Sequence, residues 1–330
     1  MESSPLSPYT TRRSFRGKPE IRPQAFHRPA IQRPVPRPVR RPDPQTVKYT
    51  RYPWRISKEK RMTLCAAAIT GDYIVTISDT MVSGSTISAD GCTLKMEPFA
   101  RDWLAMISGD DITQALPIIQ RASKYMHHRA NTVATARVAF KKAYQQHLVE
   151  MKTDAVLSGY GLNMDTFQKS GKRRFTDKIF ASLCENMDAV KVGCEFLVFG
   201  FDGAGRAHIF TVSDPGIDRT FDKPGFCCIG SGMYAADAML YYFQQATDKS
   251  LSETVFALCA SKFMAERSGI GRDTYLYVMQ FGSIFSQHRP GLIDDVRKAW
   301  DGYGAPSVPR GVIELINEGS ITQWPSIRKP

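Results

Sequence analysis

The chain has 330 residues, 42% of them hydrophobic, and a formal net charge of +12. The excess charge lies in residues 1–61, which hold 16 Lys+Arg against 4 Asp+Glu, whereas residues 62–330 hold 28 of each kind. This distribution excludes a generally basic nucleic-acid-binding domain and leaves only the N-terminal segment suited to nucleic acid. The lack of any run of about 18 apolar residues excludes a membrane-spanning helix, so we expect no membrane partner.

The N-terminal 61 residues are too polar and too rich in proline to fold. Of the 20 prolines, 11 fall in residues 1–60, where they remove backbone donors while the arginines stay solvated. We therefore expect a disordered or polyproline-like tail. It is a propeptide, a docking arm, or the product of a translation start upstream of a true start at Met62.

Two β-hairpins are expected after this tail. The apolar run Thr63-Leu-Cys-Ala-Ala-Ala-Ile69 and the β-branched run Tyr73-Ile-Val-Thr-Ile-Ser78 flank the turn residues Thr70-Gly-Asp72, a pattern typical of paired strands. A second hairpin is predicted with strands near residues 91–96 and 103–107.

The rest of the chain alternates between helices and strands. Helices are predicted near residues 112–128, 132–151, 177–187, 234–246 and 251–267, the last with Ser252 as its N-cap. Strands are predicted near residues 195–201, 206–212, 226–229 and 273–280. Residues 281–330 are expected to form a mainly irregular C-terminal extension with one short helix near residues 293–300.

The order of these elements predicts the fold class. Pairs of antiparallel strands alternate with pairs of helices, whereas a parallel βαβ fold would place single helices between single strands. We therefore expect an α+β protein with a four-layer αββα sandwich, in which two antiparallel sheets lie between helix layers. Residues 62–280 would form this domain.

Residues of the two hairpins resemble the opening of a proteasome β-type subunit and of the peptidase of its bacterial ATP-dependent relative. In that family a Thr opens the first strand, an Asp closes the second, a Lys follows on the next hairpin, and a Gly precedes the first helix. The matching residues here are Thr63, Asp79, Lys95 and Gly109, at successive intervals of 16, 16 and 14 residues. Further along, Ile229-Gly-Ser-Gly-Met-Tyr-Ala-Ala236 is similar to the family's GSG turn. The resemblance implies an N-terminal-nucleophile hydrolase fold.

The resemblance also implies a catalytic apparatus. Thr63 would be the nucleophile, activated by its own α-amino group, whose reference pKa is about 8. Lys95 would assist loss of the hydroxyl proton, and Asp79 would pair with Lys95 and hold it in place. The backbone N–H of Gly109 would stabilise the oxyanion.

Supporting and substrate-binding residues follow from the same resemblance. Ser231 would hydrogen-bond near the Thr63 amine, and Glu266 and Ser268 are the nearest matches to a supporting Asp and Ser. The substrate pocket would be lined by residues that flank Lys95 and Gly109: Thr93, Glu97, Ile107 and Asp111. Its two acidic members favour basic or polar substrate side chains. The alternative is that Glu97 faces solvent and Asp111 caps a helix.

These residues predict a threonine-type peptidase or amide hydrolase in a ring-shaped, self-compartmentalising homo-oligomer. Its partners would be a peptide or protein substrate and an ATPase activator. One feature departs from active family members, because Met62 precedes Thr63 where they commonly carry Gly. Removal of an initiator Met at position 62 would expose the amine. A non-catalytic structural subunit and a small-molecule amidohydrolase remain alternatives, since fold alone does not separate them.

The sequence contains no pattern of cysteines or histidines that indicates a cofactor, a metal site or redox chemistry. The seven cysteines contain no CxxC pair and the six histidines show no metal-ligand spacing, so we expect neither a metal nor a cofactor. Cysteines in apolar runs, such as those of Gly225-Phe-Cys-Cys-Ile-Gly230, indicate buried, reduced thiols and a cytoplasmic protein.

Overall fold

A computed structural model describes residues 63–80, 82–83, 88–89, 95–109, 112–287 and 291–304. The expected N-terminal tail, residues 1–61, and most of the expected C-terminal extension lie outside these residues. Among the helices of the described part, none is both long and apolar enough to cross a membrane.

The first sheet has five antiparallel strands in the order β10-β1-β2-β11-β12. They are β1 (Cys65–Thr70), β2 (Tyr73–Asp79), β10 (Phe226–Ile229), β11 (Thr274–Gln280) and β12 (Ser283–Gln287). Strands β1 and β2 form the predicted hairpin, with Cys65 opposite Ser78 and Thr70 opposite Tyr73. Its turn contains Gly71 at a φ of +52°, a conformation that glycine adopts at little cost.

The second sheet also has five antiparallel strands, in the order β5-β6-β7-β8-β9. They are β5 (Met96–Ala100), β6 (Trp103–Gly109), β7 (Cys194–Phe201), β8 (Ala207–Ser213) and β9 (Ile217–Thr220). A separate short pair consists of β3 (Val82–Ser83) and β4 (Ser88–Ala89).

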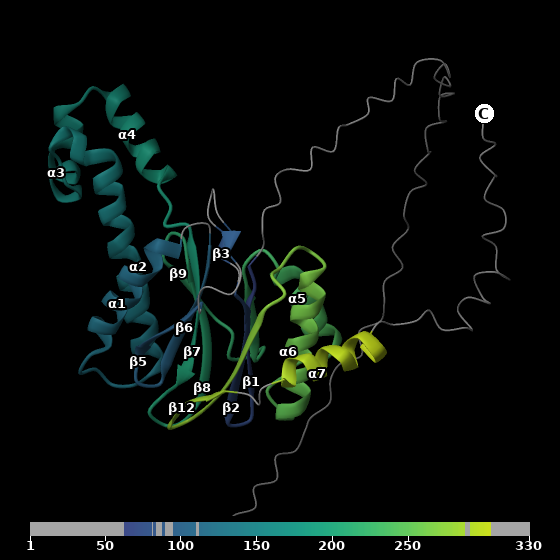
Figure 1. Cartoon of the computed structure of the whole chain (residues 1–330). Coiled ribbons are helices and arrows are strands. Elements are labelled where there is room, and N and C mark those ends of the chain that lie inside the picture. The colour runs from purple at the N-terminus through teal and green to yellow at the C-terminus, as the bar shows by residue number, and fades with distance from the viewer. Residues whose placement is uncertain are drawn as a thin grey trace, which may run out of the picture. The chain divides into compact units, whose positions relative to one another are not determined.

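Helices cover the outer face of each sheet (Figure 1). On the second sheet lie α1 (Ala115–Met126) and α2 (Val133–Lys152), and on the first lie α5 (Met233–Tyr242), α6 (Leu251–Glu266) and α7 (Leu292–Ala299). The remaining helices, α3 (Met164–Arg174) and α4 (Asp177–Ala189), lie at the C-terminal end of α2. They have a small apolar core of their own, made by Leu157, Leu162, Phe167, Leu183 and Met187.

The alternation of side chains between the two faces of each strand explains why the sheets lie between helix layers. On β7, Phe196 and Val198 face α1 and α2, whereas Leu197 and Phe199 face the other sheet. Successive strand side chains point to opposite faces, so a strand that is apolar throughout must be covered on both sides. The α+β class and the sandwich of two antiparallel sheets between helices are therefore confirmed.

Several details differ from the expectation. Strand β9 was not predicted, and the strand expected near residues 91–96 is β5 at Met96–Ala100. Helix α3 was not predicted because its composition is polar; a capping box formed by Asn163 and Thr166 begins it. Helix α6 is capped by Ser250, whose partner in a capping box is Glu253, rather than by Ser252. The segment after residue 280, expected to be irregular, begins with β12, which pairs with β11 and widens the first sheet.

A buried histidine predicts how stability depends on pH. His208 on β8 has its Nδ1 2.7 Å from Asp222 and its Nε2 3.4 Å from Asp202. The hydrogen bond to Asp222 raises the pKa of His208 above its ordinary value of 6.5, although burial opposes this. A raised folded-state pKa stabilises the fold fully below pH 6.5, and this contribution is lost as pH rises through the folded-state pKa.

We therefore expect the melting temperature of the wild type to fall more steeply than that of His208→Gln as the pH rises above 6.5. Thermal unfolding in a series of buffers measures this. Identical slopes in the two proteins would show that the His208 carboxylate contacts do not control stability in this range.

Candidate active site

Thr63 lies at the start of the first hairpin and contacts two other segments, through Lys95 and through Ser231 and Gly232. Its hydroxyl accepts a hydrogen bond from Lys95 Nζ at 3.2 Å, and its backbone N donates to Ser231 Oγ at 3.1 Å. Its carbonyl oxygen accepts from the backbone N of Gly232 at 3.2 Å. The segment between β10 and α5 is therefore held against the residue that precedes β1.

A buried ion pair lies directly behind this hydroxyl. Lys95 Nζ is 2.8 Å from Asp79 Oδ1, and the two side chains are 3% and 0% exposed. The same carboxylate oxygen accepts a hydrogen bond from the backbone N of Leu64 at 2.9 Å. Because either charge left alone at this depth would be costly, the pair fixes the position of the ammonium group beside Thr63.

Two glycines permit the close approach of the segments around Thr63. A Cβ at Gly230 would lie less than 3.0 Å from the Thr63 carbonyl oxygen and from the Ser108 hydroxyl. A Cβ at Gly109, whose φ is +153°, would lie less than 3.0 Å from the carbonyl oxygen of Gly193. Any larger residue at either position would force the backbone apart.

Glu266 and Ser268 belong to a different group of contacts. The Glu266 carboxylate receives two hydrogen bonds from the Arg297 guanidinium, at 2.7 and 2.8 Å, and is paired with Lys262. Ser268 is exposed, and its backbone N donates to Ala265. The structure therefore joins Thr63, Asp79, Lys95 and Ser231 by hydrogen bonds and gives Glu266 other partners.

This second group centres on a buried lysine that the sequence reading missed. Lys262 is 0% exposed, and its Nζ donates to the carbonyl oxygens of Gly271 at 2.6 Å and Arg272 at 2.8 Å. Burial lowers the pKa of Lys262, while the charges of Glu266 and Asp79 act to raise it. The sequence did carry a signal for this group, because Lys262 lies within an otherwise apolar stretch of α6 and a buried lysine needs partners.

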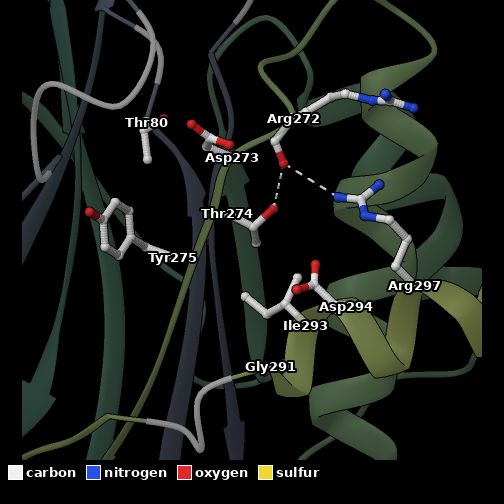
Figure 2. A pocket seen from close by; sticks show the side chains of 9 residues that line it. All are labelled: Thr80, Arg272, Asp273, Thr274, Tyr275, Gly291, Ile293, Asp294 and Arg297. Carbon is white, nitrogen blue, oxygen red and sulfur yellow. Dashed lines mark hydrogen bonds between the residues drawn. The ribbon is translucent and has the colours of Figure 1, made fainter.

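Helix α7 completes this group (Figure 2). The Arg297 guanidinium and the Thr274 hydroxyl both donate to the Arg272 carbonyl oxygen, at 3.3 and 3.0 Å. Arg297 also lies over the ring of Phe263, 4.1 Å from its centroid. A hollow of ≈ 570 Å³ lies between α7 and the start of β11, with Thr80 on its opposite wall.

The predicted substrate-binding residues are only partly described. Thr93 and Asp111 lie outside the described residues. Ile107 is buried, and its carbonyl oxygen accepts from Cys65 Sγ at 3.4 Å. Glu97 is half-buried on β5 and lines a hollow of ≈ 400 Å³ together with residues of α1, among them Leu116 and Ile119.

The arrangement around Thr63 places a hydroxyl beside a buried ammonium group, a combination that can favour loss of the hydroxyl proton. Gly109 ends β6. Within the described ranges, no group of three or more His, Cys, Asp or Glu side chains could hold a metal ion. Burial also raises the pKa of the Cys65 thiol to about 12, so that it remains protonated.

The fold is similar to those of two solved proteins of the Anbu type. The "Anbu (ancestral beta-subunit)" of Yersinia bercovieri aligns over 78% of this chain and 98% of its own, with a TM-score of 0.52 and 11% identity. The "Anbu (Gly-1) mutant" of Hyphomicrobium sp. strain MC1 aligns over the same shares, with a TM-score of 0.50 and 13% identity. Identities this low show a shared fold alone.

The family expected from the sequence is not supported. No family model and no curated protein matches the chain, and the structural neighbours are Anbu proteins at 11 and 13% identity. The assignment to the proteasome β-type or bacterial proteasome-like peptidase family was therefore wrong. Its landmarks were single residues at strand ends and turns, which the sandwich itself favours, and they carry little information about family.

The contacts of Arg297 predict a stability effect that a neighbouring residue should lack. Arg297→Met removes two hydrogen bonds to Glu266, so we expect a loss of about 1–3 kcal/mol in the free energy of unfolding. Lys298→Met, on the same helix but 80% exposed, should change it by less than about 0.5 kcal/mol. Urea unfolding measures both; equal values for the two variants would contradict a specific role of Arg297.

Proposed function

We propose that this protein hydrolyses peptide or related amide bonds, with Thr63 as an N-terminal nucleophile. The observation that carries the proposal is the distance of 3.2 Å between Lys95 Nζ and the Thr63 hydroxyl oxygen. A buried ammonium at hydrogen-bond distance from a hydroxyl favours loss of the hydroxyl proton. Asp79 would keep the ammonium in place.

The proposed reaction needs a free α-amino group on Thr63. That amine would take the hydroxyl proton, directly or through one water molecule, as the oxygen bonds to the substrate carbonyl carbon. Collapse of the tetrahedral intermediate would break the C–N bond, and the leaving amine would take the proton. Water would then hydrolyse the resulting ester and regenerate Thr63. The Gly109 N–H would stabilise the oxyanion in both steps.

The contact between Thr63 N and Ser231 Oγ supports this role of the amine. A hydroxyl both donates and accepts hydrogen bonds, so Ser231 would orient the amine whether it is neutral or protonated. Removal of Met62 and everything before it is a requirement of the proposal. If the mature chain retains Met62, Thr63 N is an amide and the alternative of a non-catalytic subunit holds.

Assembly into a ring-shaped homo-oligomer is part of the proposal. One structural neighbour is described as a beta-subunit, which is a name for one copy within a larger particle. Helix α5 carries three exposed tyrosines, Tyr234, Tyr241 and Tyr242, and aromatic residues are enriched at protein interfaces. The ATPase activator and the cytoplasmic location stay predictions.

Hydrolysis by mature protein tests the proposal directly. We expect Thr63→Ala to lower the rate on a set of fluorogenic peptides by about 10³-fold or more, because it removes the nucleophile. Thr63→Ser should retain part of the rate. Lys178→Met, which removes an exposed ammonium on α4, serves as the control and should leave the rate unchanged.

Mass spectrometry of the same samples identifies the first residue of the chain. Activity should be found only in molecules that begin with Thr63. Equal activity of Thr63→Ala and the wild type, or activity in a chain that still carries Met62, would refute the proposal.

A further inference from the structure

A third hollow adjoins the candidate site, and of its lining residues the proposed chemistry uses only Gly109. Its volume is ≈ 380 Å³, near the lower end of the range for ligand pockets, about 300–1,000 Å³, which suits one side chain. It is lined by the ends of β6, β7 and β8: Ser108, Gly109, Gly193, Cys194, Glu195, Ser213 and Asp214.

The wall formed by Ser108 and Gly109 connects this hollow to Thr63. The Ser108 hydroxyl and the Thr63 carbonyl oxygen both lie less than 3.0 Å from one point, the place where a Cβ of Gly230 would be. Gly109, the proposed oxyanion donor, follows Ser108 directly. A substrate whose scissile carbonyl lies between Thr63 and Gly109 would therefore pass next to this hollow.

Glu195 is an acidic residue of the hollow and lies across from its wall residue Ser108. It is directly opposite Ser108 in the β6–β7 pair, and directly opposite residues share a face of the sheet. Its charge also acts on the Cys65 thiol, as do the charges of Lys95 and Asp79. The Glu195 carboxylate therefore lies in the same electrostatic environment as the candidate catalytic pair.

The two acidic residues of the hollow, Asp214 and Glu195, differ in their hydrogen-bond partners. Both oxygens of Asp214 accept backbone hydrogen bonds, from Val192 and Gly193, each at 3.0 Å. Glu195 has no hydrogen bond or ion pair with the described residues, and burial raises its pKa while the charge of Arg219 opposes this. A partly buried carboxylate without a fixed partner gains most from a cationic ligand.

We propose that Glu195 is a specificity-determining residue and that the hollow beside Gly109 binds a lysine or arginine side chain of the substrate. The inference rests on the proposed function, because it assigns a substrate class to the Thr63 site. It differs from the sequence expectation, in which Glu97 and Asp111 favoured basic side chains. Glu97 lines a separate hollow with residues of α1.

Arginine and citrulline provide a matched pair of probes, because they differ in charge and little in shape. We would scan each of them through every position of an alanine-based peptide with a fluorogenic reporter. Wild-type protein should cleave the arginine peptide at least about tenfold faster than the citrulline peptide, in kcat/KM, at one position near the scissile bond. Glu195→Gln should bring this ratio close to 1, because it slows cleavage of the arginine peptide far more than cleavage of the citrulline peptide.

Two further carboxylate variants make the result specific. Glu185→Gln removes an exposed carboxylate on α4 and should preserve the tenfold ratio. If Glu97→Gln abolishes the preference for arginine and Glu195→Gln preserves it, the proposal is overturned in favour of the hollow next to α1. It is also overturned if Glu195→Gln slows both peptides equally.

Binding to a catalytically inactive protein separates this inference from the proposed function. Thr63→Ala should bind the arginine peptide about tenfold more tightly than the citrulline peptide, by calorimetry, and Thr63→Ala/Glu195→Gln should bind both equally. If Thr63→Ala shows this binding preference but the wild type shows no cleavage that depends on Thr63, the proposed hydrolase activity is refuted and the proposed cation site is supported. Equal binding of the two peptides by Thr63→Ala would refute the cation site, whatever the activity.

Discussion

The ion pair between Lys95 and Asp79 is the interaction on which the arrangement around Thr63 depends. Its members come from opposite sheets, because Asp79 ends β2 and Lys95 precedes β5. Neither charge would be stable alone at this depth, so the two sheets can close over this end of the sandwich only with the pair formed. Since Asp79 also accepts from the backbone N of Leu64, the same carboxylate fixes the first residues of β1. The position of the Thr63 hydroxyl is therefore a consequence of the fold.

A second buried lysine, Lys262, is also paired with a carboxylate, on the other face of the first sheet. Lys262 neutralises Glu266 and satisfies two carbonyl oxygens of the loop that leads into β11, and Arg297 of α7 binds the same carboxylate. Thr274, which begins β11, lies opposite Asp79. The C-terminal helix is thus joined through one loop to the strand that borders the candidate site. Buried charges near a site must be neutralised in pairs, and here one pair joins the two sheets while the other, on α6, is bound by Arg297 of α7.

The sequence predicted the sandwich because each layer leaves a local pattern. The first hairpin has β-branched strands around a Gly turn, and the order of strand pairs and helix pairs distinguishes an antiparallel sandwich from a parallel sheet. Thr63, Asp79 and Lys95 were singled out by their spacing in the resemblance to the proteasome β-type opening, although that family assignment was wrong. The structure places Lys95 in contact with both Asp79 and Thr63, and the catalytic roles of the three residues are part of the proposed function. Helix α3 escaped detection because a short polar helix is specified by its cap and not by an apolar stripe.

The parts that could not be predicted depend on contacts between distant segments. Glu266 was matched to a supporting acid by its distance along the chain, but Arg297 and Lys262 determine where its carboxylate lies, and nothing local reports that pairing. Glu195 was expected only as the first residue of a strand, because its position opposite Ser108 follows from the register of β6 and β7. Charge in a substrate pocket is therefore better inferred from the carboxylate that lacks a fixed partner than from the acid nearest in sequence to a presumed catalytic residue. By this criterion Asp214, whose two oxygens are both occupied by backbone N–H groups, shapes the hollow, and Glu195 gives it its charge.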